Sequence, residues 1–175
     1  MKNTSLTFYE ADLGSIPLIK ILAERIWISV YSDILSKTQI DYMMEMMYSH
    51  ISLTEQINIL SHVFWILVWD NTPIGFLSYQ LNYRFSKKMK LHKIYIESTF
   101  RGSGLGKEVI RNLELLALQK SQESIILNVN KNNSAINFYQ KAGFIKVKEE
   151  QIDIGNGYIM DDFIMEKFLI PLINL

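Results

Sequence analysis

The stretch Arg101-Gly102-Ser103-Gly104-Leu105-Gly106-Lys107 decides the fold of this chain, because it joins an apolar strand pattern to a long amphipathic helix pattern. Glycines let a backbone come close to a ligand, and successive N–H groups at the start of a helix point toward an anion. The spacing fits neither a P-loop, which needs Ser or Thr where this chain has Glu108, nor the Gly-x-Gly-x-x-Gly fingerprint of dinucleotide sites. The turn therefore predicts a backbone cradle for a pyrophosphate, with a tight turn that binds nothing as the alternative.

The segments on both sides of this turn show regular hydrophobic periodicity. Strands are predicted at residues 6–8, 62–69, 74–83, 89–97, 124–129, 144–148 and 158–168, and helices at 15–34, 38–60 (broken near Ser52), 104–120 and 132–142. Residues 70–73 have turn chemistry, so the strands on either side of them form a hairpin. The order of elements predicts a mixed sheet covered by helices, of class α/β or α+β.

The composition limits the classes of function. Lys and Arg number 18 and Asp and Glu number 18, so no bulk charge attracts nucleic acid or anionic lipid. The chain has no cysteine, and its three histidines have no ligand spacing, so we expect no metal site. The apolar stretches are too short to span a membrane, and residues 1–13 do not resemble a signal peptide. We therefore expect a cytoplasmic protein with no membrane or nucleic-acid partner.

A second segment makes the interpretation much more specific. It runs Val129-Asn-Lys-Asn-Asn-Ser-Ala-Ile-Asn-Phe-Tyr-Gln-Lys-Ala-Gly-Phe144. Together with the glycine turn it resembles the GCN5-related N-acetyltransferase (GNAT) family, whose pattern is Arg/Gln-x-x-Gly-x-Gly/Ala after the fourth strand, then Asn-x-x-Ala-x-x-x-Tyr and Gly-Phe. The matching residues are Arg101, Gly104, Gly106, Asn132, Ala135, Tyr139, Gly143 and Phe144. Ser98 stands where many members have proline, which changes the stiffness of the loop rather than the chemistry.

The resemblance implies a single N-acetyltransferase domain over residues 1–175 with the acyl-CoA N-acyltransferase fold. That fold has a mixed, mostly antiparallel sheet whose fourth and fifth strands splay apart, with helices flanking it. Acetyl-CoA is the implied cosubstrate. Its pantetheine arm would pair with backbone groups of Ile94, Tyr95 and Ile96, and its pyrophosphate with the N–H groups of Gly102, Ser103, Gly104, Leu105, Gly106 and Lys107, next to Arg101. Asn132, Ala135 and Tyr139 would complete the coenzyme site.

The implied reaction is direct attack of a primary amine on the thioester in a ternary complex. The amine must lose a proton and the leaving thiolate gains one. The resemblance implies Tyr139 as the acid, while a packed helix aromatic is the other interpretation of that residue. For the base, His92 is the first candidate, Glu97 the reserve, and a water chain the third option. A non-catalytic acyl-CoA-binding module of the same fold is the alternative function.

The acceptor is expected to be a small molecule, polyamine or peptide amine. Trp27 and Tyr31, four residues apart on one helix face, are candidates for its pocket, although core packing also explains them. Asp161 and Asp162 interrupt an apolar strand, and we expect them at a solvated edge or bulge. The apolar C-terminal segment, residues 168–175, predicts packing against a second copy of the chain.

Overall fold

The computed structural model describes residues 5–100 and 102–170. Seven strands form one sheet in the order β1-β2-β3-β4-β5-β7-β6, in which β4 and β5 run parallel and the other described pairings are antiparallel. This is the predicted α+β architecture. The strands are β1 (Leu6–Glu10), β2 (Val63–Trp69), β3 (Thr72–Gln80), β4 (Lys88–Ile96), β5 (Ser124–Asn130), β6 (Ile145–Gly155) and β7 (Tyr158–Phe168).

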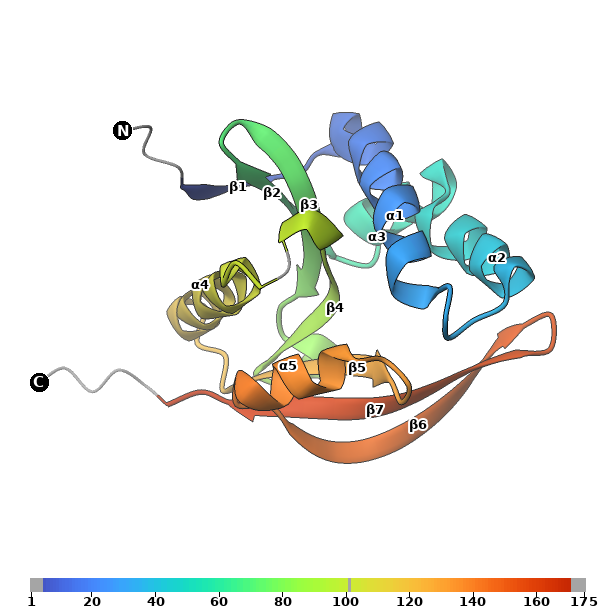
Figure 1. Cartoon of the computed structure of the whole chain (residues 1–175). Coiled ribbons are helices and arrows are strands. Elements are labelled where there is room, and N and C mark those ends of the chain that lie inside the picture. Colours follow the sequence, from blue (N-terminus) through green and yellow to red (C-terminus); the bar gives the residue numbers. More distant parts are fainter. Residues whose placement is uncertain (1–4, 101, 171–175) are drawn as a thin grey trace, which may run out of the picture. The chain divides into compact units, whose positions relative to one another are not determined.

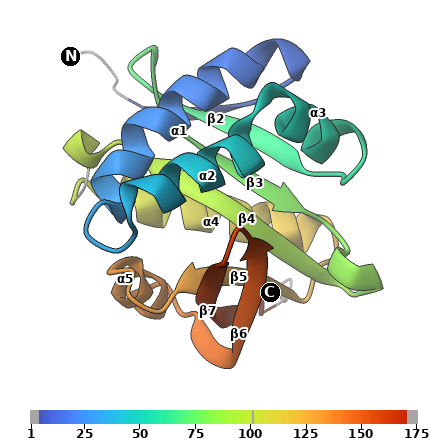
Figure 2. The same cartoon turned by 90° about the vertical axis from the view of Figure 1, so that its right-hand side faces the viewer.

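Five α-helices connect these strands (Figures 1 and 2). They are α1 (Ile16–Tyr31), α2 (Lys37–Tyr48), α3 (His50–Asn58), α4 (Leu105–Gln119) and α5 (Ala135–Lys141). Short 3-10 turns, η1 (Leu13–Ser15), η2 (Tyr83–Phe85) and η3 (Ser98–Phe100), precede α1, β4 and the glycine-rich turn. None of the helices in the described part of the chain is both long and apolar enough to cross a membrane.

The chain divides into two compact units, which we describe separately. The first contains the described residues up to 79 and those from 93 to 106, and the second contains residues 80–92 and 107 onward. The chain passes from one unit to the other inside β3 and β4 and near the start of α4.

In the first unit, α1, α2 and α3 cover one face of the strands. Phe64, Phe76 and Leu77 are almost fully buried on β2 and β3, and Ile19 and Leu22 on α1. Capping defines where the helices begin. Asp12 caps η1, the turn that leads into α1, by accepting a hydrogen bond from Ser15 N (3.0 Å), and Ser36 caps α2 by accepting one from Gln39 N (3.2 Å).

In the second unit, α4 and α5 lie against one side of the strands. Lys167 on β7 donates to Glu114 on α4 (2.5 Å) and to the Ala142 carbonyl at the end of α5 (2.6 Å). Gly143 has φ +92, so the helix ends in the left-handed conformation that glycine adopts most easily. Phe144, which follows it, is 1% exposed and anchors this end of the helix in the core.

Several boundaries differ from the prediction, and three of the differences have a local structural cause. The helical region 38–60 breaks at Ser49, whose side chain caps α3, and not near Ser52. The helix predicted from residue 132 begins only at Ala135, because Asn133 Oδ1 accepts the Ala135 N–H and holds the preceding residues in a turn. The strand predicted at 144–148 continues to Gly155, and its pairing with β7 explains the extension.

Candidate functional site

The glycine-rich turn has the backbone that its sequence predicts. Gly102 and Gly104 have φ values of +79 and +86, the left-handed region that favours glycine, and a Cβ on either would meet nothing within 4 Å. Ser103 Oγ donates to the Phe100 carbonyl (2.5 Å), which closes the turn on itself just before α4 begins at Leu105. Arg101 lies outside the described residues. The exposed backbone at the start of a 15-residue helix fits an anionic group.

The end of β4 in the first unit has an unusual contact with β3. A Cβ added to Gly75 would lie 2.1 Å from the Tyr95 carbonyl oxygen and 3.0 Å from Ile96 Cα, so only glycine fits there. Glu97, the residue directly after β4, donates its N–H to the Ile74 carbonyl (2.8 Å). These contacts fix the backbone of Tyr95 and Ile96, two residues predicted to bind the coenzyme.

The pairing of β4 with β5 is short. Its register runs from Lys88 opposite Ser124 to Leu91 opposite Leu127, although β4 continues to Ile96 and β5 to Asn130. Among the described residues of the second unit the ladder therefore stops before either strand ends, in agreement with the predicted splay.

Aromatic side chains from α1, α2 and β4 meet in the first unit. The Trp27 ring lies 4.5 Å from that of Tyr31 and 6.1 Å from that of Tyr95, and the Tyr31 and Tyr95 hydroxyls are 3.3 Å apart. Trp27 Nε1 donates to Tyr48 Oη (3.2 Å). Burial is the main cause that raises the pKa of both the Tyr48 and the Tyr95 hydroxyl above its usual value. The two predicted acceptor residues thus contact the predicted coenzyme strand, while Tyr48 is a member that the sequence analysis missed.

Glu97 is held by a partner far away in the sequence. Arg25 on α1 donates to Glu97 Oε1 at 2.8 Å, and the Glu97 side chain is 20% exposed. Lys93, Tyr95 and Glu97 occupy alternate positions and all contact groups of the helical layer, because alternate side chains of an extended segment point to the same face. No signal in the sequence identifies Arg25, because 72 positions separate it from Glu97.

Lys93 is buried in the first unit without a carboxylate partner among the described residues. Its ammonium donates to Gln56 Oε1 (2.6 Å) and lies 5.5 Å and 5.7 Å from the ring centres of Phe64 and Tyr48. Burial lowers the pKa of Lys93 to about 8. Burial, followed by the nearby Lys93 charge, lowers the pKa of His62 to about 4.

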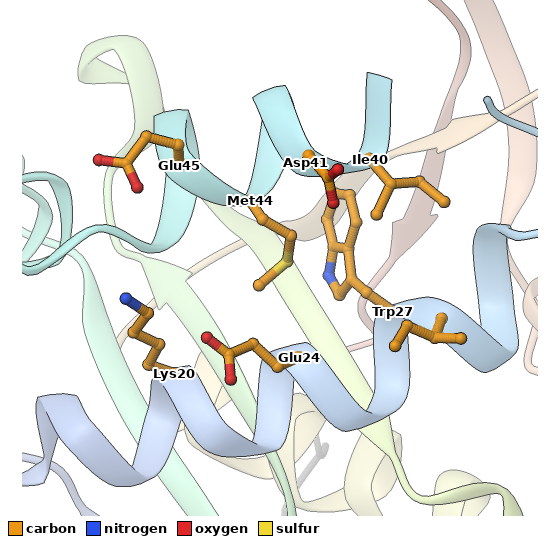
Figure 3. A pocket seen from close by; sticks show the side chains of 8 residues that line it. Lys20, Glu24, Trp27, Ile40, Asp41, Met44 and Glu45 are labelled. Atoms are coloured by element: carbon orange, nitrogen blue, oxygen red, sulfur yellow. The ribbon is translucent and has the colours of Figure 1, made fainter. Parts of the chain in front are cut away.

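A shallow groove of about 320 Å³ lies between α1 and α2 (Figure 3). Trp27 forms its back wall and the remaining residues line its sides and rim: Lys20, Glu24, Ile28, Ile40, Asp41, Met44 and Glu45. Its three carboxylates exceed its one lysine, and Lys37 already pairs with Asp41 at 2.6 Å. The groove is therefore a mildly acidic surface whose back wall is the aromatic side chain of Trp27.

Tyr139 lies on α5 in the second unit and is 8% exposed. Its ring contacts those of Phe138 (5.3 Å) and Phe144 (5.7 Å), so packing fixes its position. Asn132 lies in the turn before α5, where its N–H donates to Asn130 Oδ1 (2.9 Å), and Ala135 opens the helix. Lys107 is exposed in the first turn of α4.

His92 lies on the part of β4 that belongs to the second unit. Its Nε2 is 3.3 Å from Gln80 Oε1, and the Tyr83 ring stands edge-on to the imidazole at 6.1 Å. The predicted acid and the first candidate base are thus both in this unit, and the reserve base, Glu97, is in the other. Groups of three or more potential metal ligands do not occur among the residues that the structure describes.

Asp162 is buried (2% exposed) on β7, between β5 and β6, so the expectation of a solvated edge is wrong for this residue. It belongs to a polar row across four strands. Lys90 donates to Asn128 Oδ1, and Asn128 Nδ2 donates to Glu150 (3.2 Å) and to Asp162 (3.5 Å). Burial raises the pKa of Asp162 and lowers that of Lys90 to about 8. Asp161 instead pairs with Lys131 at 2.7 Å.

Comparison with known proteins adds independent information. The acetyltransferase (GNAT) family model matches residues 27–144. The PaiA N-acetyltransferase of Thermoplasma acidophilum, solved in complex with coenzyme A, is 25% identical with a TM-score of 0.76, over 94% of this chain and 99% of that one. A GCN5-related N-acetyltransferase from Rhodopseudomonas palustris gives a TM-score of 0.78 at 16% identity, over 97% of this chain and 99% of that one. A spermidine N-acetyltransferase chimera that includes Vibrio cholerae sequence gives 0.67 at 17%, over 93% of this chain and 95% of that one.

Proposed function

This chain belongs to the GNAT family of acetyl-CoA-dependent N-acetyltransferases, and we propose that it acetylates a primary amine by direct attack in a ternary complex. The observation that carries the proposal is the glycine-rich turn, with two left-handed glycines and open space around them at the start of α4. A backbone of this shape fits the coenzyme pyrophosphate because its N–H groups supply donors at no steric cost.

The coenzyme would be held mainly by backbone groups. Those of Ile94, Tyr95 and Ile96 would pair with the pantetheine amides as an added strand does. The fixed position of Tyr95 and Ile96 against Gly75 supports this role, since hydrogen-bond donors must be in place before charge develops on the thioester oxygen. Acetyl-CoA supplies the activated acyl group.

Proton transfers complete the reaction. The amine nitrogen attacks the acetyl carbon, the carbon–sulfur bond breaks, and the acetylated amine leaves with free coenzyme A. One proton passes from the amine to a base, and one passes to the departing sulfur from an acid. We assign the acid to Tyr139, because its ring is held by Phe138 and Phe144 and a phenol can donate at neutral pH.

Replacement of Tyr139 by Phe tests this assignment. We expect kcat to fall about 10²-fold or more with little change in the Kd for coenzyme A, because the ring packing remains and only the proton donor is lost. Thiol release measures kcat and calorimetry measures Kd. Tyr9→Phe on β1, where the side chain is exposed, is the matched control and should leave both constants unchanged.

The alternative function, an acyl-CoA-binding module without turnover, predicts a different result. Such a protein would bind coenzyme A with the wild-type sequence yet release no thiol with any amine. A panel of small amines, polyamines and peptides with free N-termini therefore decides between the two functions. The same panel identifies the acceptor class, which the fold alone does not determine.

A further inference from the structure

Side chains continue the connection between β4 and β5 where the backbone ladder of these strands ends. The ladder runs only to Leu91 opposite Leu127. Lys90 lies opposite Ile126, and its ammonium donates to Asn128 Oδ1, on the next β5 residue that faces the same side of the sheet. In the second unit this bond therefore stands at the point where the two strands begin to separate.

The Asn128 amide is held in one orientation by charges on both of its sides. Its oxygen accepts from the Lys90 ammonium, and its nitrogen donates to Glu150 Oε2 (3.2 Å) and to Asp162 Oδ2 (3.5 Å). A reversed amide would place its N–H groups against an ammonium, which can only donate, and its oxygen against two carboxylates, which accept. The Asn128 side chain therefore cannot turn without losing its partners.

The strands that carry these carboxylates form a continuous set. β5 pairs with β7 along its whole length, and β6 pairs in turn with β7. In the second unit, β4 joins this set through the short ladder and, at the open end of the ladder, through the Lys90 ammonium. Lys90 is 7% exposed and Asp162 is 2% exposed, so water screens the polar row far less than it screens a surface ion pair.

We propose that Lys90 and Asn128 are positioning residues for the coenzyme, because their bond sets the point at which β4 and β5 separate to admit the pantetheine arm. The inference rests on the proposed function, in which that arm pairs with the backbone of β4 as an added strand does. Without the bond, β4 separates from β5 earlier, and its backbone donors are no longer held at one distance from β5. The loss falls on coenzyme affinity and not on the chemical step.

Asn128→Leu tests the proposal, because leucine has a similar size and no hydrogen-bonding group. We expect the Kd for coenzyme A to rise about 10-fold, the scale of effect when hydrogen bonds to charged groups are lost. The kcat at saturating acetyl-CoA should change by less than about 3-fold. Calorimetry measures Kd and thiol release measures kcat. Lys90→Met should give the same pattern.

A fragment of the coenzyme separates this effect from a general loss of structure. Adenosine 3′,5′-bisphosphate, the nucleotide part of coenzyme A, lacks the pantetheine arm. Its Kd should be the same for the wild type and for both variants, because only the arm depends on the separation of the strands. Nuclear magnetic resonance titration measures this weaker binding.

The closed end of the same ladder supplies a matched control. There Ser124 on β5 donates to the buried Glu166 of β7 (2.6 Å), and Lys88 on β4 pairs with the same carboxylate (2.8 Å). Ser124→Ala removes a buried hydrogen bond of similar type where β4 and β5 remain paired. The Kd for coenzyme A should therefore stay at the wild-type value.

Exchange of an amide and a carboxylate within the polar row provides a rescue. N128D alone places a third carboxylate beside Glu150 and Asp162 and should weaken coenzyme binding. In N128D/D162N the carboxylate at position 128 accepts from Lys90, and the amide at position 162 donates to it. The Kd for coenzyme A should then return to within about 3-fold of the wild-type value, which shows that the bonds and not the residue types matter.

Circular dichroism must show that the variants compared are folded. The inference is overturned if folded Asn128→Leu and Lys90→Met bind coenzyme A as tightly as the wild type, or if Ser124→Ala weakens binding as much as they do. It is also overturned if affinity for the nucleotide fragment falls in parallel, or if N128D/D162N binds no better than N128D. A wild-type protein that does not bind coenzyme A would instead overturn the proposed function itself.

Discussion

Two titratable side chains are candidates for the base: His92 on β4 and Glu97, which directly follows β4. Glu97 is paired with Arg25 at 2.8 Å, so its carboxylate already has a cationic partner. His92 has an imidazole, whose usual pKa is near 6.5. A base of this kind produces an acid limb in the pH profile of kcat/KM near neutrality.

We expect His92→Gln to remove that acid limb and to lower kcat/KM at pH 7 by about 10²-fold, in the range of general-base effects. Glu97→Gln should leave the limb in place. The measurement is kcat/KM between pH 5.5 and 9 with an amine that the panel identifies, and Arg25→Gln serves as the control for the ion pair. An acid limb that persists in His92→Gln would show that a group other than His92 takes the proton.

The lowered pKa of the buried Lys93 side chain predicts that the free energy of unfolding depends on pH. Below about pH 8 the lysine is protonated in the folded and the unfolded chain, and the folded state bears the cost of a buried charge. Above about pH 8 and below the usual lysine pKa of 10.5, the unfolded chain binds the proton and the folded chain does not, so the free energy of unfolding rises with pH. Lys90, with a pKa of about 8, adds to the same rise.

Lys93→Met should therefore increase the free energy of unfolding at pH 7 by about 1–2 kcal/mol, because a buried charge is replaced by an apolar side chain of similar length. It should also weaken the rise above pH 8. Urea denaturation at several pH values measures both effects. Lys120→Met, at an exposed position, should change stability by less than about 0.5 kcal/mol. Destabilisation by Lys93→Met would show that the bond to Gln56 matters more than the burial cost.

Among the elements, β3 and β4 depend on one glycine for their close approach. Gly75→Ala would place a methyl group 2.1 Å from the Tyr95 carbonyl oxygen. Because that oxygen belongs to the backbone and cannot move aside as a flexible side chain can, the two strands must separate. We expect a loss of about 2–3 kcal/mol in the free energy of unfolding and weaker coenzyme binding. Gly157→Ala is the matched control. It has φ +76 and open space, and strain alone should cost about 1 kcal/mol without affecting the coenzyme.

The sequence predicted most elements because their signals are local. The glycine turn, the apolar run of β2 and the Gly143 helix stop each depend on neighbours in the chain, and each was found in the structure. Contacts between distant segments have no such signal. Arg25 with Glu97, Tyr48 with Trp27, and the buried Asp162 all depend on which strands and helices become neighbours after folding. Gly75 is an exception, since a glycine inside an apolar strand indicates close backbone approach.

At the scale of the whole molecule, the path of the chain makes independent folding of the two units difficult. β3 and β4 each contribute residues to both units, so neither strand is complete in one of them. A strand that is ordered in one half and disordered in the other would lose ladder hydrogen bonds at the point of division. We therefore expect one cooperative unfolding transition.

Two spectroscopic probes test this expectation. All three tryptophans, Trp27, Trp65 and Trp69, lie in the first unit, so their fluorescence reports on that unit alone. Far-ultraviolet circular dichroism reports on helices and strands of both units. The two probes should give the same urea midpoint within error. Separate midpoints would mean that one unit unfolds while the other persists.

The polar row across the second unit has a consequence for how this sequence can drift over generations. Asn128 links Lys90 on one side to Glu150 and Asp162 on the other, so loss of Asn128 deprives the buried Lys90 and Asp162 side chains of a hydrogen-bond partner, and loss of another member removes one bond of the row. A stepwise path to an apolar replacement must then pass through a less stable ancestor at each step. We expect descendants of this gene either to keep all four side chains or to exchange them together, so the row should be inherited as a block.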